Sequence, residues 1–263
     1  VGAKLRIPVA HLEAGLRSRD RNMPEEINRL VTDSIADMLW TPSPDANDNL
    51  RAEGVADEKI GFVGNIMIDS FELMRDKIAA SNVVERLGLK PQAYGAVTMH
   101  RPSNVDSREQ LACLLGELEA VSERLPLVFA VHPRTRQRMA DFDLVLSDRA
   151  QIKLIDPLGY LDFMKLVSDS RLVITDSGGI QEETTYLGIP CLTLRDNTER
   201  PITITEGTNR LVNAKTLQPA LLAALASQPG AHKPPALWDG HTADRAVASL
   251  RAFMEQRGLC TAC

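Results

Sequence analysis

Short apolar runs alternate with longer amphipathic segments along most of the chain. The short runs are rich in Val, Ile and Leu, which is typical of buried strands, and the longer segments repeat their apolar residues at helical spacing. We expect strands at 5–10, 37–41, 60–63, 95–99, 127–131, 152–155, 171–175 and 190–194. We expect helices at 24–36, 46–53, 66–79, 108–124, 136–140, 160–167, 179–187, 216–226 and 241–257. Strands that alternate with helices predict βαβ units and an α/β fold with parallel sheets.

Two interruptions of this pattern indicate how the chain is divided into domains. The segment 61–66 ends one strand and begins a long helix, and 233–240 contains two prolines and breaks the regular spacing. We predict that residues 1–64 are the carboxyl-terminal part of a Rossmann-like domain and that residues 65–238 form a second, complete one. Residues 239–263 are expected to form a helix that returns to the first domain, followed by a tail.

The beginning of the sequence is unusual for a domain of this kind. An apolar segment at 5–11 has the composition of a strand in a parallel sheet. Such a strand is normally buried between neighbours on both sides. We therefore expect that an amino-terminal portion of the first domain is missing from this sequence.

The composition narrows the class of protein. Hydrophobic residues make up 44% and charged residues 25%, which is average for a globular protein and excludes a disordered chain. No apolar run approaches the roughly 20 residues that a membrane span needs. A formal net charge of −5 argues against nucleic acid as a partner, since nucleic-acid binders usually present a basic face. We expect no membrane and no nucleic-acid partner.

Cysteine usage adds little chemistry. Cys260 and Cys263 form a C-T-A-C sequence, but one such pair cannot complete a zinc site, and no βαβ pattern of the redox type surrounds it. We predict that this pair belongs to a plain tail and that the protein binds no metal. No signal peptide opens the sequence, so a cytoplasmic location is expected.

The most informative segment is L-V-I-T-D-S-G-G-I-Q-E-E at 172–183. A strand ends before Ser177, and Gly178 and Gly179 open a helix. Glycines allow a tight turn and a close approach of the backbone, and the helix amino terminus favours a phosphate group. Glu183, further along the helix, is placed to accept hydrogen bonds from ribose hydroxyls. The alternative is an ordinary turn capped by Ser177, since this is neither a dinucleotide fingerprint nor a P-loop.

Two further segments follow predicted strands. In R-D-N-T-E-R-P, Arg195 and Arg200 are suited to bidentate recognition of phosphate, although a solvated charged loop would have the same composition. In V-T-M-H-R-P-S-N-V-D, His100 directly follows an apolar run, and His132 has the same place after the next strand. A histidine at a strand end is a candidate acid or base because its pKa lies near neutrality. A structural role is the alternative for both histidines.

A last cluster contains carboxylates near the start of the chain. Glu13 follows the first apolar run, and Pro24 suits the first turn of a helix that carries Glu25 and Glu26. Two carboxylates held close together can act as an acid and a base. Compensation of the helix dipole is the common alternative for Glu25 and Glu26. Glu13 needs a partner, because it ends so apolar a run.

Together these segments resemble the non-hydrolysing UDP-N-acetylglucosamine 2-epimerases. The matching segments are H-L-E-A-G-L-R-S (11–18), P-E-E-I-N-R (24–29), G-N-I-M-I-D (64–69), H-R-P-S-N-V-D (100–106), T-D-S-G-G-I-Q-E-E (175–183), R-D-N-T-E-R-P (195–201) and G-T-N-R-L-V (207–212). Each motif is weak alone, but their order and spacing over nearly the whole chain are specific. The resemblance implies two Rossmann-like doubly wound domains of GT-B type, the first only partial here.

The resemblance also implies a reaction without metal or cofactor. In this family UDP is eliminated to leave a 2-acetamidoglucal, and UDP is then added back with the opposite configuration at C2. Glu13 and Glu25 match the family's catalytic carboxylates and His100 its active-site histidine. Which carboxylate transfers which proton stays open.

The remaining site residues are carried over in the same way. The UDP-binding turn is matched by Ser177, Gly178, Gly179 and Glu183, the arginine at the nucleotide phosphates by Arg200, and the aromatic residue near uracil by Tyr160. Arg101 and His132 lie in segments near the site where bacterial members bind a second substrate molecule as an activator. Homodimers are usual for the family.

The sequence also departs from the family pattern. The first strand, a G-T-R-P-E loop and a region with a further catalytic aspartate are absent, and Ser103 stands where many relatives have glutamate. Three alternatives therefore stay open: a GT-B glycosyltransferase that uses a UDP-sugar, a hydrolysing epimerase, and a catalytically incomplete UDP-binding fragment.

Overall fold

The computed structural model describes residues 1–227 and 232–258, and the predicted Cys260–Cys263 tail lies outside them. The chain forms two compact units. Unit 1 comprises Val1–Leu73, Thr198–Thr205 and Pro234–Cys263, and unit 2 comprises Met74–Asn197 and Glu206–Lys233. Residues 198–205, which the predicted boundaries include in the second domain, therefore pack with unit 1.

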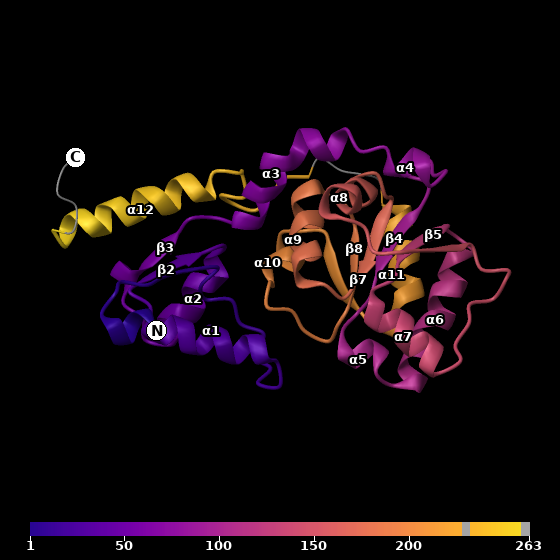
Figure 1. Cartoon of the computed structure of the whole chain (residues 1–263), viewed down its shortest axis with the longest axis horizontal. Coiled ribbons are helices and arrows are strands. Elements are labelled where there is room, and N and C mark those ends of the chain that lie inside the picture. Colours follow the sequence, from indigo (N-terminus) through magenta and orange to yellow (C-terminus); the bar gives the residue numbers. More distant parts are fainter. Residues whose placement is uncertain (228–231, 259–263) are drawn as a thin grey trace. The chain divides into compact units, whose positions relative to one another are not determined.

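Unit 1 contains a small parallel sheet, drawn in indigo and violet in Figure 1. Its strands are β1 (Ala10–Leu12), β2 (Met38–Thr41) and β3 (Ile60–Phe62), in the order β1-β2-β3. Its helices are η1 (Gly2–Leu5), α1 (Pro24–Ile35), α2 (Pro44–Ala52), η2 (Asp57–Lys59), the first part of α3 (Ile66–Ala79), α10 (Ile202–Thr205) and α12 (Thr242–Gln256). The middle strand β2 is buried along its whole length, as a parallel strand with two neighbours should be.

The last helix of the described chain is joined to this sheet by polar contacts. Trp40 of β2 donates from Nε1 to Ser249 of α12 at 2.9 Å. The carboxylate of Asp69 accepts from the backbone N–H groups of Thr242 and Ala243 at 3.1 and 2.7 Å. Asp69 thus caps the amino terminus of α12 and opposes its dipole, and residues far apart in sequence share one core.

The predicted strand at 5–10 is wrong. Gly2–Leu5 forms a 3-10 helix, Arg6 has a left-handed φ of 60°, and the first strand begins only at Ala10. The conformation of Arg6 turns the chain, and Pro8 has no N–H to donate to a strand ladder. Apolar composition alone therefore misled the assignment.

Unit 2 contains a six-stranded parallel sheet with the order β6-β5-β4-β7-β8-β9 (Figure 1). Its strands are β4 (Gly95–Thr98), β5 (Leu127–Ala130), β6 (Ile152–Ile155), β7 (Leu172–Thr175), β8 (Cys191–Leu194) and β9 (Asn209–Val212). Its helices are the end of α3, α4 (Val83–Arg86), α5 (Pro102–Val105), α6 (Arg108–Ser122), α7 (Pro133–Asp141), α8 (Tyr160–Ser168), α9 (Gly178–Leu187) and α11 (Ala214–Ala226).

This strand order creates a switch point between β4 and β7. From β4 the chain adds β5 and β6 on one side, and it then returns to add β7, β8 and β9 on the other side. The order is that of a Rossmann fold. In open α/β sheets, ligands bind outside the carboxyl ends of the strands at such a switch point. The turns that follow β4 and β7 are therefore the candidate binding position of unit 2.

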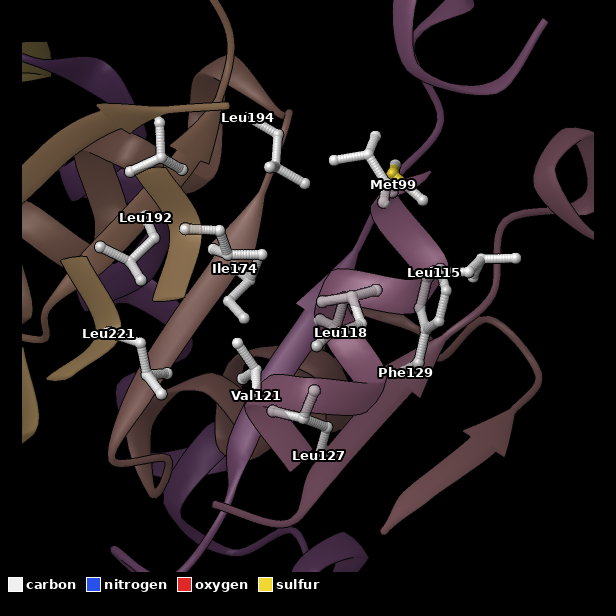
Figure 2. Packing of buried hydrophobic residues seen from close by; sticks show 14 of the residues in the cluster. Met99, Leu115, Leu118, Val121, Leu127, Phe129, Ile174, Leu192, Leu194 and Leu221 are labelled. Atoms are coloured by element: carbon white, nitrogen blue, oxygen red, sulfur yellow. The ribbon is translucent and has the colours of Figure 1, made fainter. Parts of the chain in front are cut away.

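An apolar core fixes this sheet in place. Figure 2 shows Leu115, Leu118 and Val121 of α6 facing Phe129 of β5 and Ile174 of β7. All of these side chains are buried. Burial of a side chain of this size contributes roughly 1.5–3 kcal/mol. The core therefore stabilises strands β5 and β7 and the positions of the loops that follow them.

The α/β fold class with parallel sheets is confirmed, and seven of the eight predicted strands agree with observed ones to within a few residues. Strand β9 was missed, because N-R-L-V has only two apolar residues and its Asn209 is buried. None of the helices in the described residues is both long and apolar enough to cross a membrane.

Candidate active site

The switch point of unit 2 brings two of the sequence motifs together. Strands β4 and β7 are hydrogen-bonded neighbours, with Thr98 paired to Thr175. The β4–α5 turn therefore carries His100 and Arg101 beside the β7–α9 turn, which carries Asp176 and Ser177. These motifs lie on adjacent strands although the chain separates them widely.

Asp176 joins the two turns. Its side chain is fully buried and accepts the backbone N–H of His100 at 2.9 Å, that of Arg101 at 2.7 Å and Nδ2 of Asn104 at 3.0 Å. Burial alone would raise the pKa of this carboxyl, but the hydrogen bonds and the charge of His100 hold it below its usual value. The carboxylate is therefore ionised and fixes the shape of the β4–α5 turn.

His100 is held by the same carboxylate. Its Nδ1 lies 2.8 Å from Oδ1 of Asp176, and 38% of its side chain is exposed. The ring of His132, at the end of β5, lies with its centroid 5.3 Å from that of His100. Two imidazoles are thus available at one edge of the sheet, where a ligand's phosphate or a transferable proton could be bound.

The turn after β7 leads into a helix that has no side-chain cap. Ser177 is the N-cap residue of α9, but no side-chain hydrogen bond caps this helix. Its backbone N–H donates to Oγ1 of Thr175 at 3.0 Å, and Gly178 and Gly179 form the first turn. Backbone N–H groups at a helix amino terminus are suited to an anion such as phosphate.

Glu183 lies further along the same helix, and its pKa is raised above the usual value of a glutamate. It is 5% exposed, and Tyr160, at the start of α8, donates its hydroxyl to Oε1 at 3.2 Å. Burial raises the pKa of Glu183 to about 7, more than the hydrogen bond from Tyr160 lowers it. Burial, together with the neighbouring charge of Glu183, raises the pKa of Tyr160 as well. The two candidates for nucleoside binding are therefore in contact.

Arg200 is found in the other unit. It belongs to the segment Thr198–Thr205 of unit 1, and its Nη1 lies 2.6 Å from Oε1 of Glu199. Arg29 of α1 lies 3.6 Å from the same oxygen and 3.4 Å from Glu26. Arg200 is thus connected through Glu199 to helix α1.

Glu13 follows β1 in a strained conformation. Its φ is 67°, a left-handed value that is uncommon outside glycine. Among the described residues, no hydrogen-bond partner is found for its buried Oε1. Strain and an unsatisfied carboxylate oxygen at one residue are typical of a functional site.

A buried carboxylate holds the chain on both sides of Glu13. Asp33 of α1 accepts Nδ1 of His11 at 2.5 Å, the backbone N–H of Gly15 at 3.1 Å and Nη2 of Arg17 at 2.7 Å. Burial would raise the pKa of Asp33, but the hydrogen bonds from His11 and Arg17 lower it. Arg17 also pairs with Glu53 at 2.7 Å, so the loop around Glu13 rests on an ionic network.

The two neighbouring glutamates of α1 differ in their surroundings. Glu26 is 2% exposed and accepts the backbone N–H and Oγ of Ser18 at 2.8 and 3.0 Å and the N–H of Arg19 at 3.0 Å. Glu25 is exposed. Glu26 therefore fixes the loop that follows Glu13, while the carboxylate of Glu25 is accessible.

The structure thus groups the predicted residues by unit. Unit 2 holds the set formed by His100, Arg101, His132, Tyr160, Ser177, Gly178, Gly179 and Glu183, and unit 1 holds Glu13, Glu25 and Arg200. Sequence analysis missed Asp33, Asp176 and the structural role of Glu26. Asp176 stood within the quoted turn, but its partner His100 is 76 residues away. No local pattern identifies Asp33.

Comparison with known proteins decides the family. The sequence profile described as UDP-N-acetylglucosamine 2-epimerase matches residues 1–251 of this chain. The chain belongs to this family. The resemblance inferred from the motifs is therefore confirmed.

Relatives of this epimerase family are similar in sequence as well as in fold. A UDP-N-acetylglucosamine 2-epimerase from Methanocaldococcus jannaschii is 45% identical over 220 residues, 81% of this chain and 60% of the relative. A UDP-2,3-diacetamido-2,3-dideoxy-D-glucuronate 2-epimerase from Pseudomonas aeruginosa is 40% identical over 216 residues, 81% of this chain and 58% of the relative. The chain thus spans about three fifths of the length of these curated epimerases.

A solved epimerase structure gives the same result. The Methanocaldococcus jannaschii UDP-GlcNAc 2-epimerase in complex with UDP-GlcNAc and UDP superposes with a TM-score of 0.87 at 40% identity. The similarity covers 96% of this chain and 71% of that structure. Both sheets described above are therefore part of a fold seen in the 2-epimerase family.

Proposed function

We propose that the protein interconverts UDP-N-acetylglucosamine and UDP-N-acetylmannosamine by inverting the configuration at C2. The match of the epimerase profile to residues 1–251 carries this proposal. It is supported by the helix terminus at Ser177, which suits a diphosphate, and by the buried Glu183, which suits ribose hydroxyls.

The proposed reaction has two balanced steps. A carboxylate removes the C2 proton, the electrons of the C2–H bond form a C1–C2 double bond, and the C1–O bond breaks with its electrons on UDP. A diphosphate oxygen then adds to C1 of the 2-acetamidoglucal, and an acid protonates C2 on the opposite face. General acid–base catalysis of this kind contributes about 10²–10⁴-fold in rate.

The candidate residues receive roles from this chemistry. We assign proton transfer to Glu13 and Glu25, because one has a buried oxygen without a partner among the described residues and the other is accessible. His100, the backbone at Ser177–Gly179 and Arg200 are assigned to the departing diphosphate. Glu183 is assigned to ribose and Tyr160 to the uracil side.

The proposal includes a cytoplasmic homodimer and a second molecule of UDP-N-acetylglucosamine as activator at Arg101 and His132. The two residues are near neighbours of His100: Arg101 follows it in sequence, and the ring of His132 lies beside its ring. Light scattering tests the dimer. A sigmoidal rate curve that becomes hyperbolic in His132→Gln would support the activator site, and a hyperbolic wild-type curve would contradict it.

Proton NMR in D2O tests the reaction. The protein is incubated with UDP-N-acetylglucosamine, and the expected product is UDP-N-acetylmannosamine with deuterium at C2. Free N-acetylmannosamine would identify a hydrolysing enzyme instead. Binding of UDP without turnover would identify a UDP-binding fragment, and transfer of the sugar to an added acceptor would identify a glycosyltransferase.

A second substrate enters the same assay because of the Pseudomonas relative, whose name gives a diacetamido glucuronate. Exchange of deuterium into C2 is measured for both UDP-sugars at equal concentration. Faster exchange in UDP-N-acetylglucosamine supports the proposal. Exchange in the diacetamido glucuronate alone would mean that the protein is a 2-epimerase whose substrate is this sugar and not UDP-N-acetylglucosamine.

A further inference from the structure

Two histidines end neighbouring strands of unit 2 and use the same ring nitrogen in opposite ways. Nδ1 of His100 lies 2.8 Å from the carboxylate of Asp176. Nδ1 of His132 accepts the backbone N–H of Arg134 at 3.2 Å, where His132 is the N-cap residue of α7. A carboxylate is only an acceptor, whereas a backbone N–H is only a donor. The neutral His100 ring must therefore carry its proton on Nδ1, and the neutral His132 ring on Nε2.

The environment of Asp176 keeps this arrangement fixed. The carboxylate is fully buried and receives two backbone N–H groups and an amide N–H besides the imidazole. Asn104 is itself anchored, because its Nδ2 also donates to the carbonyl of Leu194 at 3.0 Å. These donors hold the carboxylate in the anionic form and in one orientation.

The same contacts decide which nitrogen of His100 is available to a ligand. With Nδ1 on Asp176, only Nε2 is left, and within residues 1–227 and 232–258 no hydrogen-bond partner of Nε2 is found. Arg101 donates from Nε to the carbonyl of Asp176 at 3.0 Å, which holds the strand ends together. The titratable groups in contact with His100 include Asp176 and His132, and the charged Arg101 follows it in the sequence.

We infer that Asp176 is a positioning residue that keeps the proton of His100 on Nδ1 and leaves Nε2 for a phosphate bound at the turn of Ser177, Gly178 and Gly179. For catalysis the inference rests on the proposed function: Nε2 would then hold or donate a proton at the departing diphosphate. The tautomer itself does not depend on that function, so it can be tested separately.

Nitrogen-15 NMR of histidine-labelled protein tests the tautomer directly. The sequence contains five histidines, and His100→Gln and His132→Gln assign the two of interest. Above the pH at which the rings lose their charge, we expect His100 as the Nδ1–H form and His132 as the Nε2–H form. An Nε2–H form of His100 in the wild-type protein would overturn the inference.

Asp176→Asn changes the charge with little change in size. We expect His100 to become a mixture of tautomers or the Nε2–H form, while His132 keeps its Nε2–H form. An unchanged Nδ1–H form of His100 would overturn the inference. Asp169→Asn is the matched control, because Asp169 pairs with Lys165 at 3.0 Å just before the amino end of β7 and should leave both rings unchanged.

Asn104→Ala tests whether the carboxylate of Asp176 or its hydrogen-bond network as a whole fixes the proton of His100. This variant removes one donor to Asp176 and keeps the acid, so His100 should retain the Nδ1–H form. Loss of that form would mean that the whole network and not Asp176 fixes the proton, which would overturn the inference. The variant also keeps the test decisive if Asp176→Asn does not fold.

Turnover gives the second readout. If the wild-type protein epimerises UDP-N-acetylglucosamine, Asp176→Asn should lower kcat by about 100-fold, within the range for a positioned proton-transfer group, with little change in KM. A rise in KM at unchanged kcat would contradict the inference. If the wild-type protein has no turnover, the proposed function fails while the tautomer result stands.

Discussion

The candidate residues of the two units differ in how their polar atoms are satisfied. In unit 2 the carboxylate of Asp176 already has its donors, and Glu183 has Tyr160. In unit 1 Glu13 combines a left-handed backbone with a buried oxygen for which the described residues provide no partner. A buried oxygen left without a hydrogen bond costs about 1–3 kcal/mol. The carboxylates of Asp176 and Glu183 in unit 2 are therefore paired within the fold, whereas in unit 1 the described residues leave Oε1 of Glu13 without a hydrogen bond.

The supports of the two regions differ in the same way. The unit 2 turns follow the ends of β4 and β7, two short, largely buried strands that pair with each other, so topology positions them. The unit 1 loop depends on ionic contacts of Asp33 and Glu26 with residues 11–19. The comparison predicts that substitutions of the residues that support the Glu13 loop affect stability and chemistry together, while substitution of Glu183 in unit 2 acts mainly on binding.

Glu13→Gln should have the largest effect. The amide fits the same space but cannot accept a proton, so the rate of C2 proton exchange should fall by about 10²–10⁴-fold. Melting temperature should stay the same or rise, because no charged oxygen is then left buried. Glu58→Gln, in the exposed helix η2, is the control. Exchange that continues at the wild-type rate in Glu13→Gln would remove Glu13 from the proposed chemistry.

Asp33→Ala tests the ionic support of unit 1. It leaves the buried guanidinium of Arg17 and the His11 ring without their shared acceptor, so we expect a loss of about 3–5 kcal/mol in the free energy of unfolding. Urea unfolding followed by circular dichroism measures it. Asp57→Ala removes an exposed partner of Arg51 and should change stability too little to resolve. Equal effects of the two variants would contradict the role of Asp33.

Gly15→Ala tests whether the shape of the Glu13 loop is needed. Gly15 has a φ of 79°, and a Cβ there would lie 2.4 Å from the carbonyl oxygen of Ala46. Gly54 has a φ of 85° with nothing within 4 Å of a Cβ. Gly54→Ala should cost roughly 1–2 kcal/mol from its backbone alone. Gly15→Ala should cost clearly more and also slow C2 exchange, as thermal unfolding and the NMR assay would show.

The smallest expected effect is a pH dependence of UDP binding in unit 2. Glu183 has a pKa of about 7, and ribose hydroxyls donate best to its ionised form. Binding should therefore tighten about tenfold between about pH 6 and about pH 8, because the ionised fraction rises by that factor. Calorimetry measures this, and Glu183→Gln should remove the dependence. Binding that weakens with rising pH would contradict the ribose role.

The same raised pKa affects stability with a definite sign. The folded protein keeps the Glu183 proton up to about pH 7, whereas the unfolded chain loses it near the ordinary glutamate value. Stability from this group is therefore complete in acid and is lost as the pH rises to about 7. Unfolding experiments on Glu183→Gln should lack this loss.

Much of unit 2 could be predicted from the sequence. Most of its strands lie in short apolar runs, and Ser177 with its two glycines marks a strand end followed by a helix. Strand β9 was missed because it begins with two polar residues, Asn209 and Arg210. The buried side chain of Asn209 is hydrogen-bonded to Thr193 and Gln181, which belong to other elements of the sheet domain. Local patterns do not contain such partners.

Unit 1 was harder to predict for a physical reason. The strand expected at 5–10 is a helical turn, because Arg6 and Pro8 prevent an extended ladder. Glu25 and Glu26 have the same chemistry and adjacent positions, but the helix turns only Glu26 toward Ser18. Which of two such carboxylates is buried depends on the fold and not on the composition.

The separation of His100 and Asp176 along the chain has a consequence for folding kinetics. Strands β4, β5 and β6 can pair with near neighbours, whereas the β4–β7 pairing must close a segment of more than 70 residues. Closure of long segments is entropically costly and slows folding. We expect the two halves of this sheet to join late, so the turn at Ser177 and His100 come together only at the end of folding. In a refolding experiment, ligand binding would therefore appear only when β4 and β7 have paired, and not at the earlier hydrophobic collapse of the chain.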